Sequence, residues 1–286
     1  MNNSTLYRAR DYNRRIGGLE FEYDKDANGI LFLKNPPSDL APYYTNDYHF
    51  VPSHIQDYER HVHQEAYKLE LINRFKVSGC VLEIGPSIGM FLYAAKKAGF
   101  EVSAIEMSPE CCRVMRDIVG VDVHLSEDAA AELGRMGQQF DVIAMWHSLE
   151  HMRNWPDVFG AAAASLAPGG LLAIAMPNPH ALQFRIMGKW WTHLDAPRHL
   201  FLIPAQHMAD LGRAAGLLVE LITTKDRGSV DWNLFGWERS FHNFGSNRYS
   251  RYLLRKLGSV AEFLLRPFER REGQGSAYTI IFRKPV

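Results

Sequence analysis

The chain has 286 residues, of which 47% are hydrophobic, and its 32 basic residues balance 32 acidic ones to a net charge of zero. This hydrophobic content suffices for one large core, alone or with an appendage, and excludes disorder as the default state. A zero net charge gives no support for a nucleic-acid partner bound mainly through phosphates, although it leaves room for a local basic patch. We therefore expect a folded protein and no nucleic-acid partner.

The cysteines and the apolar runs bear on the cellular setting. Cys80, Cys111 and Cys112 include no C-x-x-C pair, so neither a zinc knuckle nor a disulfide framework is indicated. The N-terminal residues M-N-N-S-T-L-Y-R-A-R lack the apolar core of a signal peptide, and no run of about 18 apolar residues occurs. We expect a cytoplasmic protein that does not span a membrane.

Short apolar runs alternate with segments of helical period from residue 80 onward. The runs typical of strands lie at 80–84, 102–105, 121–125, 140–146, 170–176, 217–223 and 277–283. The helical segments lie at 89–98, 109–119, 155–166 and 204–215. Pro109 and Pro156 suit the first turns of two of these helices. The alternation predicts an α/β fold with a parallel sheet.

Residues 1–79 precede the first of these strands and form an N-terminal arm. Its middle, N-P-P-S-D-L-A-P-Y-Y-T-N-D-Y, is too rich in proline and aspartate for regular structure. A helix is expected at 57–77. The arm is either a lid over a site or simply packed against the core, and the sequence leaves both open.

The turn after the first expected strand, in V-L-E-I-G-P-S-I-G-M-F, places Gly85 and Gly89 four residues apart. Glycine at such a strand-to-helix corner lets the backbone approach a ligand closely. The dinucleotide fingerprint G-x-G-x-x-G needs glycine where Ser87 and Met90 stand, and a Walker loop needs G-K-S/T after the turn. The turn therefore disfavours both NAD and a nucleoside triphosphate.

Two glutamates stand at the ends of consecutive strands. Glu83 lies just before the turn, and Glu106 ends the next strand in A-I-E-M-S-P. Carboxylates at strand C-termini accept hydrogen bonds from ligand hydroxyl groups. An acid in the second position commonly takes the two hydroxyls of a ribose, whereas Glu83 suits a cationic group of the same ligand. The pair predicts a positively charged nucleoside; the alternative is that both are solvated strand ends.

Four stretches follow one another along residues 80–224: E-I-G-P-S-I-G-M-F, then Glu106, then F-D-V-I-A-M-W-H-S-L-E-H-M, then L-A-P-G-G-L-L-A-I-A-M-P-N. In this order they resemble the class I S-adenosylmethionine-dependent methyltransferases. L-E-H after the fourth strand, P-G-G before the fifth, and H-L-D-A-P-R-H-L-F-L-I-P are similar to the small-molecule branch. The resemblance implies a Rossmann-like, seven-stranded, mostly parallel sheet with helices on both faces. To this the sequence adds an N-terminal extension and an insertion between strands six and seven.

The resemblance also implies a set of residues that bind S-adenosylmethionine. These are Tyr48, Glu83, Gly85, Ser87, Gly89, Glu106, Met107, His147 and Ser148. The family's turn usually has a central glycine where this chain has Ser87, whose hydroxyl can face the cofactor's carboxylate. That departure opens the alternative of a cofactor-binding protein without activity. Tyr48 forms with Tyr43 and Tyr44 an aromatic cluster that either closes over the sulfonium by cation–π attraction or only packs.

The letters H-x-x-E-H, from His147 to His151, also match the pattern of an inverted zinc protease. That pattern requires both histidines one turn apart on a helix, so that both reach the metal. Here F-D-V-I-A-M-W is an expected strand, which puts His147 at a strand end, and the spacing shows no third ligand. We expect no metal site. The resemblance instead places His147 and Ser148 against the cofactor, with Glu150 and His151 at the entrance to the next loop.

Three histidines are candidate catalytic residues. Transfer of a methyl group from a sulfonium requires positioning, exclusion of water and, for a hydroxyl nucleophile, removal of a proton. Histidine is the commonest base near neutral pH. The candidates are His151, His193 and His199; the last two lie in W-W-T-H-L-D-A-P-R-H-L after the fifth strand, and His199 is the family-like one. For each, a structural hydrogen bond within a loop is the alternative.

Residues 225–275 form the insertion between strands six and seven. Its first part, D-W-N-L-F-G-W-E-R-S-F-H-N-F, carries aromatic residues that suit a sugar ring, a polyketide or another bulky acceptor. Its second part, at 248–267, is amphipathic and basic. Such a stretch either rests on a membrane surface or packs as a substrate cap or dimer face, and the sequence leaves these open.

We expect four regions: an arm or lid (1–79), a SAM-binding core (80–224), a substrate cap (225–275) and the last core strand (276–286). The expected function is methyl transfer from S-adenosylmethionine to a small molecule, above all to a hydroxyl of a sugar, a glycolipid precursor or a secondary metabolite. The alternatives are an RNA or protein methyltransferase, disfavoured by the neutral charge and the lack of an RNA-binding module, and a non-catalytic cofactor-binding protein. The same sheet serves oxygen, nitrogen and carbon acceptors, so the acceptor atom stays open, as does a homodimer.

Overall fold

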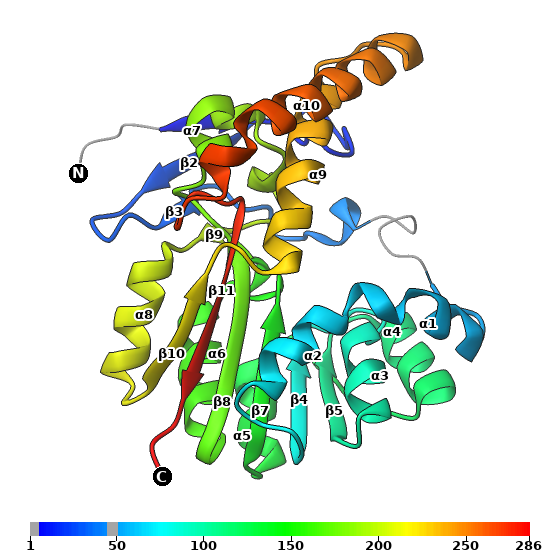
Figure 1. Ribbon diagram of the computed structural model, residues 1–286, viewed down its shortest axis with the longest axis vertical. Coiled ribbons are helices and arrows are strands. Elements are labelled where there is room, and N and C mark those ends of the chain that lie inside the picture. Colours follow the sequence, from blue (N-terminus) through cyan, green and yellow to red (C-terminus); the bar gives the residue numbers. More distant parts are fainter. Residues whose placement is uncertain (1–5, 45–50) are drawn as a thin grey trace. The chain divides into compact units, whose positions relative to one another are not determined.

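The computed structural model describes residues 6–44 and 51–286 and divides into two compact units (Figure 1). The first unit contains the described part of residues 1–45 together with 176–208 and 222–279. The second unit contains the described part of residues 46–175 together with 209–221 and 280–286. The first unit thus combines three stretches that are far apart in the sequence.

Seven strands form one sheet in the order β10-β11-β8-β7-β4-β5-β6 (Figure 1). They are β4 (Cys80–Ile84), β5 (Glu101–Glu106), β6 (Asp122–Leu125), β7 (Phe140–Trp146), β8 (Leu166–Pro177), β10 (Leu218–Thr223) and β11 (Ala277–Arg283). The pairs β4–β5, β4–β7, β5–β6 and β7–β8 are parallel. The central strands are near-continuous runs of buried aliphatic residues, as expected for parallel strands covered on both faces. The mostly parallel, Rossmann-like sheet predicted from the sequence is confirmed.

Helices connect these strands. The helices α3 (Met90–Lys97), α6 (Trp155–Ala164) and α8 (Ala205–Ala214) agree with the predicted ranges within two residues. The predicted helix at 109–119 is α4 (Pro109–Val114) followed by a short π-helix, η3 (Met115–Val119). Pro109 and Pro156 lie in first turns, as predicted.

One helix of this unit, α5 (Ala129–Met136), was not predicted. Its run A-A-A-E-L offers few large apolar residues, so its helical period is weak in the sequence. The side chain of Asp128 caps it by accepting a hydrogen bond from the backbone N–H of Ala131. In the sequence, the capping residue Asp128 is the feature that could have predicted the start of α5.

The helical region before β4 is broken where a single helix at 57–77 was expected. It consists of α1 (Ile55–His61), a 3-10 turn η2 (Val62–Gln64) and α2 (Ala66–Asn73). The stretch H-V-H at the break has lower helix propensity than its flanks, which fits an interruption there. The prediction of one continuous helix is therefore wrong, although its location is right.

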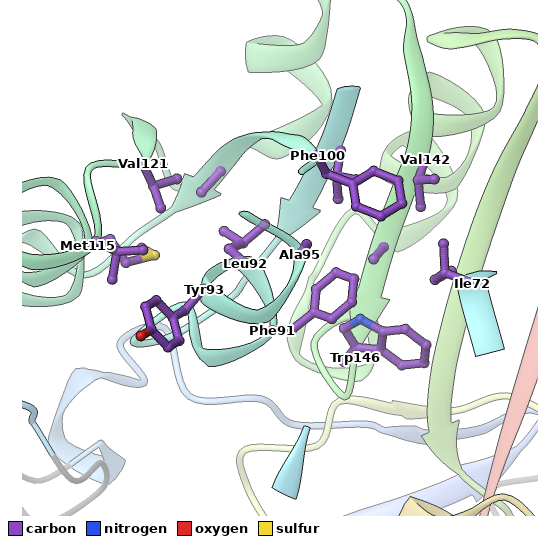
Figure 2. Close-up of a cluster of buried hydrophobic side chains, with 14 of the residues drawn as sticks. Ile72, Phe91, Leu92, Tyr93, Ala95, Phe100, Met115, Val121, Val142 and Trp146 are labelled. Atoms are coloured by element: carbon purple, nitrogen blue, oxygen red, sulfur yellow. The ribbon is translucent and has the colours of Figure 1, made fainter. Parts of the chain in front are cut away.

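A core cluster that is mostly in the second unit lies against the helix that follows β4. Figure 2 shows Phe91 and Leu92 of α3 among buried side chains that include Val142 and Trp146 of β7. The rings of Phe91 and Trp146 meet edge to face, with centroids 5.7 Å apart. This packing fixes the start of α3, and with it the turn between β4 and α3.

The first unit has a small antiparallel sheet in the order β1-β2-β3-β9. Its strands are β1 (Tyr7–Ala9), β2 (Phe21–Lys25), β3 (Leu31–Leu33) and β9 (Phe201–Leu202). The turn D-A-N-G joins β2 to β3, with Gly29 at φ 81° and the Asp26 carboxylate accepting from the backbone of Asn28 and Ile30. This sheet was not predicted, because its strands are short and β3 pairs with a strand far along the chain.

The remaining α-helices of this unit are α7 (Leu182–Met187), α9 (Arg227–Asn243) and α10 (Arg248–Glu269), and two short 3-10 helices, η5 (Gly188–Trp190) and η6 (Thr192–Leu194), follow α7. The proline-rich middle of the arm is irregular over its described part, residues 34–44, apart from one 3-10 turn, η1 (Ala41–Tyr43), as expected. Among the described residues, no helix is both long and apolar enough to cross a membrane.

Candidate functional site

The candidate site in the second unit begins with the turn between β4 and α3. Three of its residues have positive φ: Gly85 at 71°, Ser87 at 56° and Gly89 at 73°. This left-handed backbone is costly for a residue with a Cβ atom, on the order of 1 kcal/mol or more. Ser87 therefore holds a conformation that glycine would hold without strain, at the position where the resembling family usually has glycine.

The two glycines are required by space as well as by φ. A Cβ atom on Gly85 would lie 2.7 Å from Cβ of Ser148, and one on Gly89 would lie 2.6 Å from the sulfur of Met115. The hydroxyl of Ser148 donates to the carbonyl of Ile84 over 2.7 Å. The residue after β7 is thereby fixed against the end of β4, and the turn is tightly packed from both sides.

Glu106 at the end of β5 is held by backbone amides. Its Oε2 accepts from the N–H of Ser87 (3.0 Å) and its Oε1 from the N–H of Ser108 (2.8 Å). Burial raises the pKa of this carboxyl group, while these amide hydrogen bonds oppose the shift. The next residue, Met107, is 57% exposed. Glu106 is thus a buried acid with a fixed orientation. One of its carboxylate oxygens accepts from Ser87 in the β4 turn, and the other accepts from Ser108, two residues further along the chain.

Glu83 is also buried, at 3% exposure, but its setting is different. Burial raises its pKa to about 8, and the ammonium of Lys68 opposes that shift. Lys68 of α2 forms an ion pair with Glu65 and lies with its Nζ 5.4 Å from the ring centroid of Trp146. Burial alone would lower the pKa of Lys68, yet the neighbouring acids raise it. Lys68 was not predicted, because nothing in the sequence connects a helical lysine to a strand that begins twelve residues later.

The H-x-x-E-H letters follow β7 and do not lie on an α-helix. His147 has φ 56° at the strand end, and Leu149–His151 forms a 3-10 turn, η4. Nδ1 of His147 is 3.7 Å from a carboxylate oxygen of Glu150, which is fully buried. The one-turn spacing of two histidines on a helix, which the inverted zinc protease needs, is absent from this segment. His151 is half-buried at the end of the turn.

His193 and His199 lie in the first unit, and both are buried. Nδ1 of His199 is 2.8 Å from the backbone carbonyl of His193. A carbonyl only accepts, so Nδ1 carries the proton and Nε2 is the basic nitrogen. Nε2 of His193 donates to the carbonyl of Trp232 over 3.1 Å, and the two rings stack with centroids 4.4 Å apart. The His193 ring is therefore anchored.

A buried ion network supports this histidine segment. Both Asp11 and Asp195 accept hydrogen bonds from the guanidinium of Arg198, which is fully buried. Burial would raise the pKa of Asp195, but Arg198 holds it well below its usual range. The network joins the arm to the segment before His199, and neither Arg198 nor Asp11 was predicted, because their partnership spans most of the chain.

The candidate residues belong to both compact units. The second unit brings together Glu83, Gly85, Ser87, Gly89, Glu106, Met107, His147 and Ser148 around the ends of β4, β5 and β7, with His151 one turn further on. The first unit holds His193 and His199. Tyr48 lies outside the described residues, and Tyr43 is a core residue of the first unit whose ring meets Phe21 edge to face.

Comparison with known proteins gives a consistent result. A family model described as a methyltransferase domain matches residues 57–222. The chain is 30% identical over 169 residues to a ubiquinone biosynthesis O-methyltransferase of Xanthomonas euvesicatoria pv. vesicatoria, covering 54% of this chain and 69% of that protein. A protein of the same name from Aeromonas salmonicida is 29% identical over 150 residues, covering 49% and 63%.

Among solved structures, a SAM-dependent methyltransferase from Archaeoglobus fulgidus has a TM-score of 0.53 to this chain. The sequences are 20% identical, and the match covers 77% of this chain and 93% of that one. At this identity the likeness shows a shared fold.

Proposed function

This chain belongs to the class I S-adenosylmethionine-dependent methyltransferases, and from that premise we propose that it methylates a hydroxyl group of a small-molecule acceptor. The acceptor classes we propose are a sugar, a glycolipid precursor or a secondary metabolite. Two relatives bear the name of an O-methyltransferase, which supports oxygen as the acceptor atom. The observation that carries the proposal is the tautomer of His199, which its hydrogen bond to the carbonyl of His193 fixes. A hydroxyl acceptor must lose a proton on methylation, and the unprotonated nitrogen of this tautomer can take it.

The residues around the ends of β4 and β5 fit S-adenosylmethionine, the cofactor of this family. The turn from Gly85 to Gly89 lets the backbone come close to a ligand, because its two glycines have no side chains. Glu106 is a buried acid that backbone amides orient. When bound, the cofactor supplies a methyl group that its sulfonium charge already activates. We assign Glu106 to the ribose hydroxyls and the turn, with Ser87, to the methionine portion.

Glu83 and the residues after β7 complete the proposed cofactor set. A buried carboxyl with a raised pKa gains most from a cationic partner, which restores its charged form; the amino group of the cofactor has this charge. Met107, His147, Ser148 and Tyr48 belong to the same assignment. The hydrogen bond from Ser148 to β4 keeps the β7 end in place.

We propose His199 as the base that takes the acceptor's proton at Nε2. Its Nδ1–H is committed to the carbonyl of His193, so no tautomeric change is needed before the proton arrives. His193, stacked on Trp232, acts as a positioning residue through its backbone. His151 is the second candidate base, at the end of η4.

The insertion supplies a surface suited to the acceptor. Phe235 of α9 is 54% exposed, and its ring centroid lies 5.8 Å from that of His193. Exposed aromatic faces stack on sugar rings and other bulky acceptors. We therefore propose residues 225–275 as an acceptor-binding cap.

Methyl-transfer assays with matched hydroxyl, amine and thiol acceptors test the proposal. Transfer to a hydroxyl compound is expected, with His199→Gln lowering kcat by about 10² to 10⁴-fold. His193→Gln, which keeps its backbone carbonyl, should lower kcat less. A variant His199→Gln that works at the wild-type rate, or transfer to amines alone, would overturn the assignment.

A further inference from the structure

Helix α10 has two different faces, and one of them packs against α9. It packs along α9 within the first unit (Figure 1). At Gly258 an added Cβ atom would lie 2.6 Å from the carbonyl oxygen of Trp237 and 2.8 Å from Cα of Glu238. The backbones of the two helices are thus in close contact there, and this inner face is buried.

The opposite face of α10 is apolar and exposed. Eight side chains between 46% and 86% exposed form it: Tyr249, Tyr252, Leu253, Leu257, Val260, Phe263, Leu264 and Phe268. Successive members are mostly three or four residues apart, so they share one side of the helix along its 22 residues. We name this set the α10 stripe. A monomeric protein rarely leaves so continuous an apolar surface in water.

Basic residues outnumber acidic ones on α10 and just after it. The basic residues are Arg248, Arg251, Arg255, Lys256, Arg266, Arg270 and Arg271. The acidic residues of the helix, Glu262 and Glu269, are both buried. Glu272, just after the helix, is exposed and forms an ion pair with Lys225. Glu262 pairs with Arg266. The solvent side of the helix therefore presents apolar and positive groups without an acidic one.

Cations stand directly beside the aromatic members of the stripe. Nζ of Lys256 lies 5.7 Å from the ring centroid of Tyr252, and the guanidinium carbon of Arg271 lies 5.0 Å from that of Phe268. Such pairs place a long cationic side chain at the edge of an apolar surface. This arrangement matches the boundary between acyl chains and headgroups of a bilayer.

We propose that the α10 stripe binds the surface of a membrane that contains anionic lipids. An amphipathic helix with apolar and aromatic residues on one side and Lys or Arg beside them lies in the plane of the interface with its apolar side immersed. Anionic headgroups meet the cations that flank the stripe. The helix lies on the bilayer and does not cross it, since no described helix qualifies as a span.

Charge favours a membrane over a second copy of this chain as the occupant. In a two-fold dimer the same surface meets itself, so the flanking cations of both copies would be brought together. Exposed acids that would neutralise them do not lie on α10. An anionic bilayer covers the apolar residues and neutralises the flanks at once. This inference does not depend on the acceptor proposed above.

Sedimentation of the full chain with lipid vesicles tests the inference. Vesicles of phosphatidylcholine alone are compared with vesicles that contain phosphatidylglycerol, at low and at raised salt. Binding is expected only with the anionic lipid, and it should weaken at raised salt, because the attraction is screened. Equal partitioning onto both vesicles, or no binding to either, would overturn the proposal.

Two variants and a matched control locate the contact. Leu253→Asp should lower the partition coefficient about tenfold or more, because burial of a leucine is lost and a charge is added. The control Leu19→Asp changes a leucine of the same 62% exposure outside α10 and should bind as the wild type does. Lys256→Glu, which leaves the apolar residues in place, should lower binding by about fivefold or more on anionic vesicles.

Analytical ultracentrifugation distinguishes the competing occupant. The wild type is expected to stay monomeric over the concentrations used for sedimentation with vesicles. A dimer that Leu253→Asp abolishes, found together with wild-type-like vesicle binding by the same variant, would show that a second copy covers the stripe and would refute the membrane assignment.

Discussion

The two compact units differ in how the chain builds them. In the second unit, strands alternate with helices along the chain. Candidate cofactor residues such as Glu83, Gly85 and Glu106 stand at or just after a strand end. In the first unit, β3 pairs with β9 and Arg198 reaches back to Asp11. The comparison shows that a sequence pattern predicts contacts within one strand–turn–helix unit. It does not predict contacts between segments that are far apart in the sequence.

The units also stabilise buried charge differently. The second unit holds Glu106 with backbone amides of neighbouring turns, whereas the first unit neutralises Asp11 and Asp195 with one arginine. Removal of a side chain should therefore have a local effect in the second unit and a global effect in the first. The following predictions probe that contrast, from the largest expected effect to the smallest.

Arg198→Met should cause the largest loss of stability. It leaves the buried carboxylate of Asp11 and the largely buried carboxylate of Asp195 without their cation, which typically costs about 3–5 kcal/mol. Urea unfolding measures the change in the free energy of unfolding. Arg213→Met removes an exposed ion pair with Asp210 and should change it by no more than about 0.5 kcal/mol. A loss from Arg198→Met as small as that of the control would show that the network does not join the segments of the first unit.

Glu106→Ala should abolish measurable binding of S-adenosylmethionine, an affinity loss of about 100-fold or more. On the proposed assignment, this change removes two hydrogen bonds from ribose hydroxyls to a charged group, each contributing about 1.5–3 kcal/mol. Calorimetric titration measures the affinity, and thermal unfolding shows whether the turn at Ser87 survives. Glu110→Ala, an exposed acid nearby, should bind as the wild type does. Retained affinity in Glu106→Ala would remove this residue from the cofactor site.

Glu83 should make stability fall as pH rises. Its pKa is about 8 in the folded chain, and its ordinary value, which applies to the unfolded chain, is 4.5. Between pH 4.5 and about 8 the folded chain therefore binds more protons than the unfolded chain. The stabilising contribution is fully present below pH 4.5 and is lost as pH rises to about 8, by up to about 1.4 kcal/mol per pH unit. Unfolding at several pH values, compared with Glu83→Gln, isolates this slope. Identical slopes for the two proteins would contradict the buried, protonated state.

Ser87→Gly should have the smallest effect. Glycine takes φ 56° without strain, so the free energy of unfolding should rise by up to about 1 kcal/mol. If the hydroxyl faces the cofactor's carboxylate, affinity should fall by about fivefold, the value of one hydrogen bond. Titration and urea unfolding of the same variant separate the two effects. Tighter binding together with lower stability would contradict both parts.

The sequence predicted most of the second unit for a physical reason. Strands such as β4 and β7 are buried on both faces, so their apolar runs are visible without any partner, and glycines mark the turn. It did not predict Lys68 beside Glu83, because a lysine on a helix carries no sign of the strand it will face. It did not predict β1 to β3 either, since strands of three to five residues signal little until β9 joins them.

Titration of the purified full chain with S-adenosylmethionine, and separately with its demethylated product, tests the central claim most directly. Heat of binding measures the affinity without any need to know the acceptor. The account predicts saturable binding of both nucleosides with dissociation constants in the micromolar range. Absence of binding for both, in a sample shown to be folded, would contradict it.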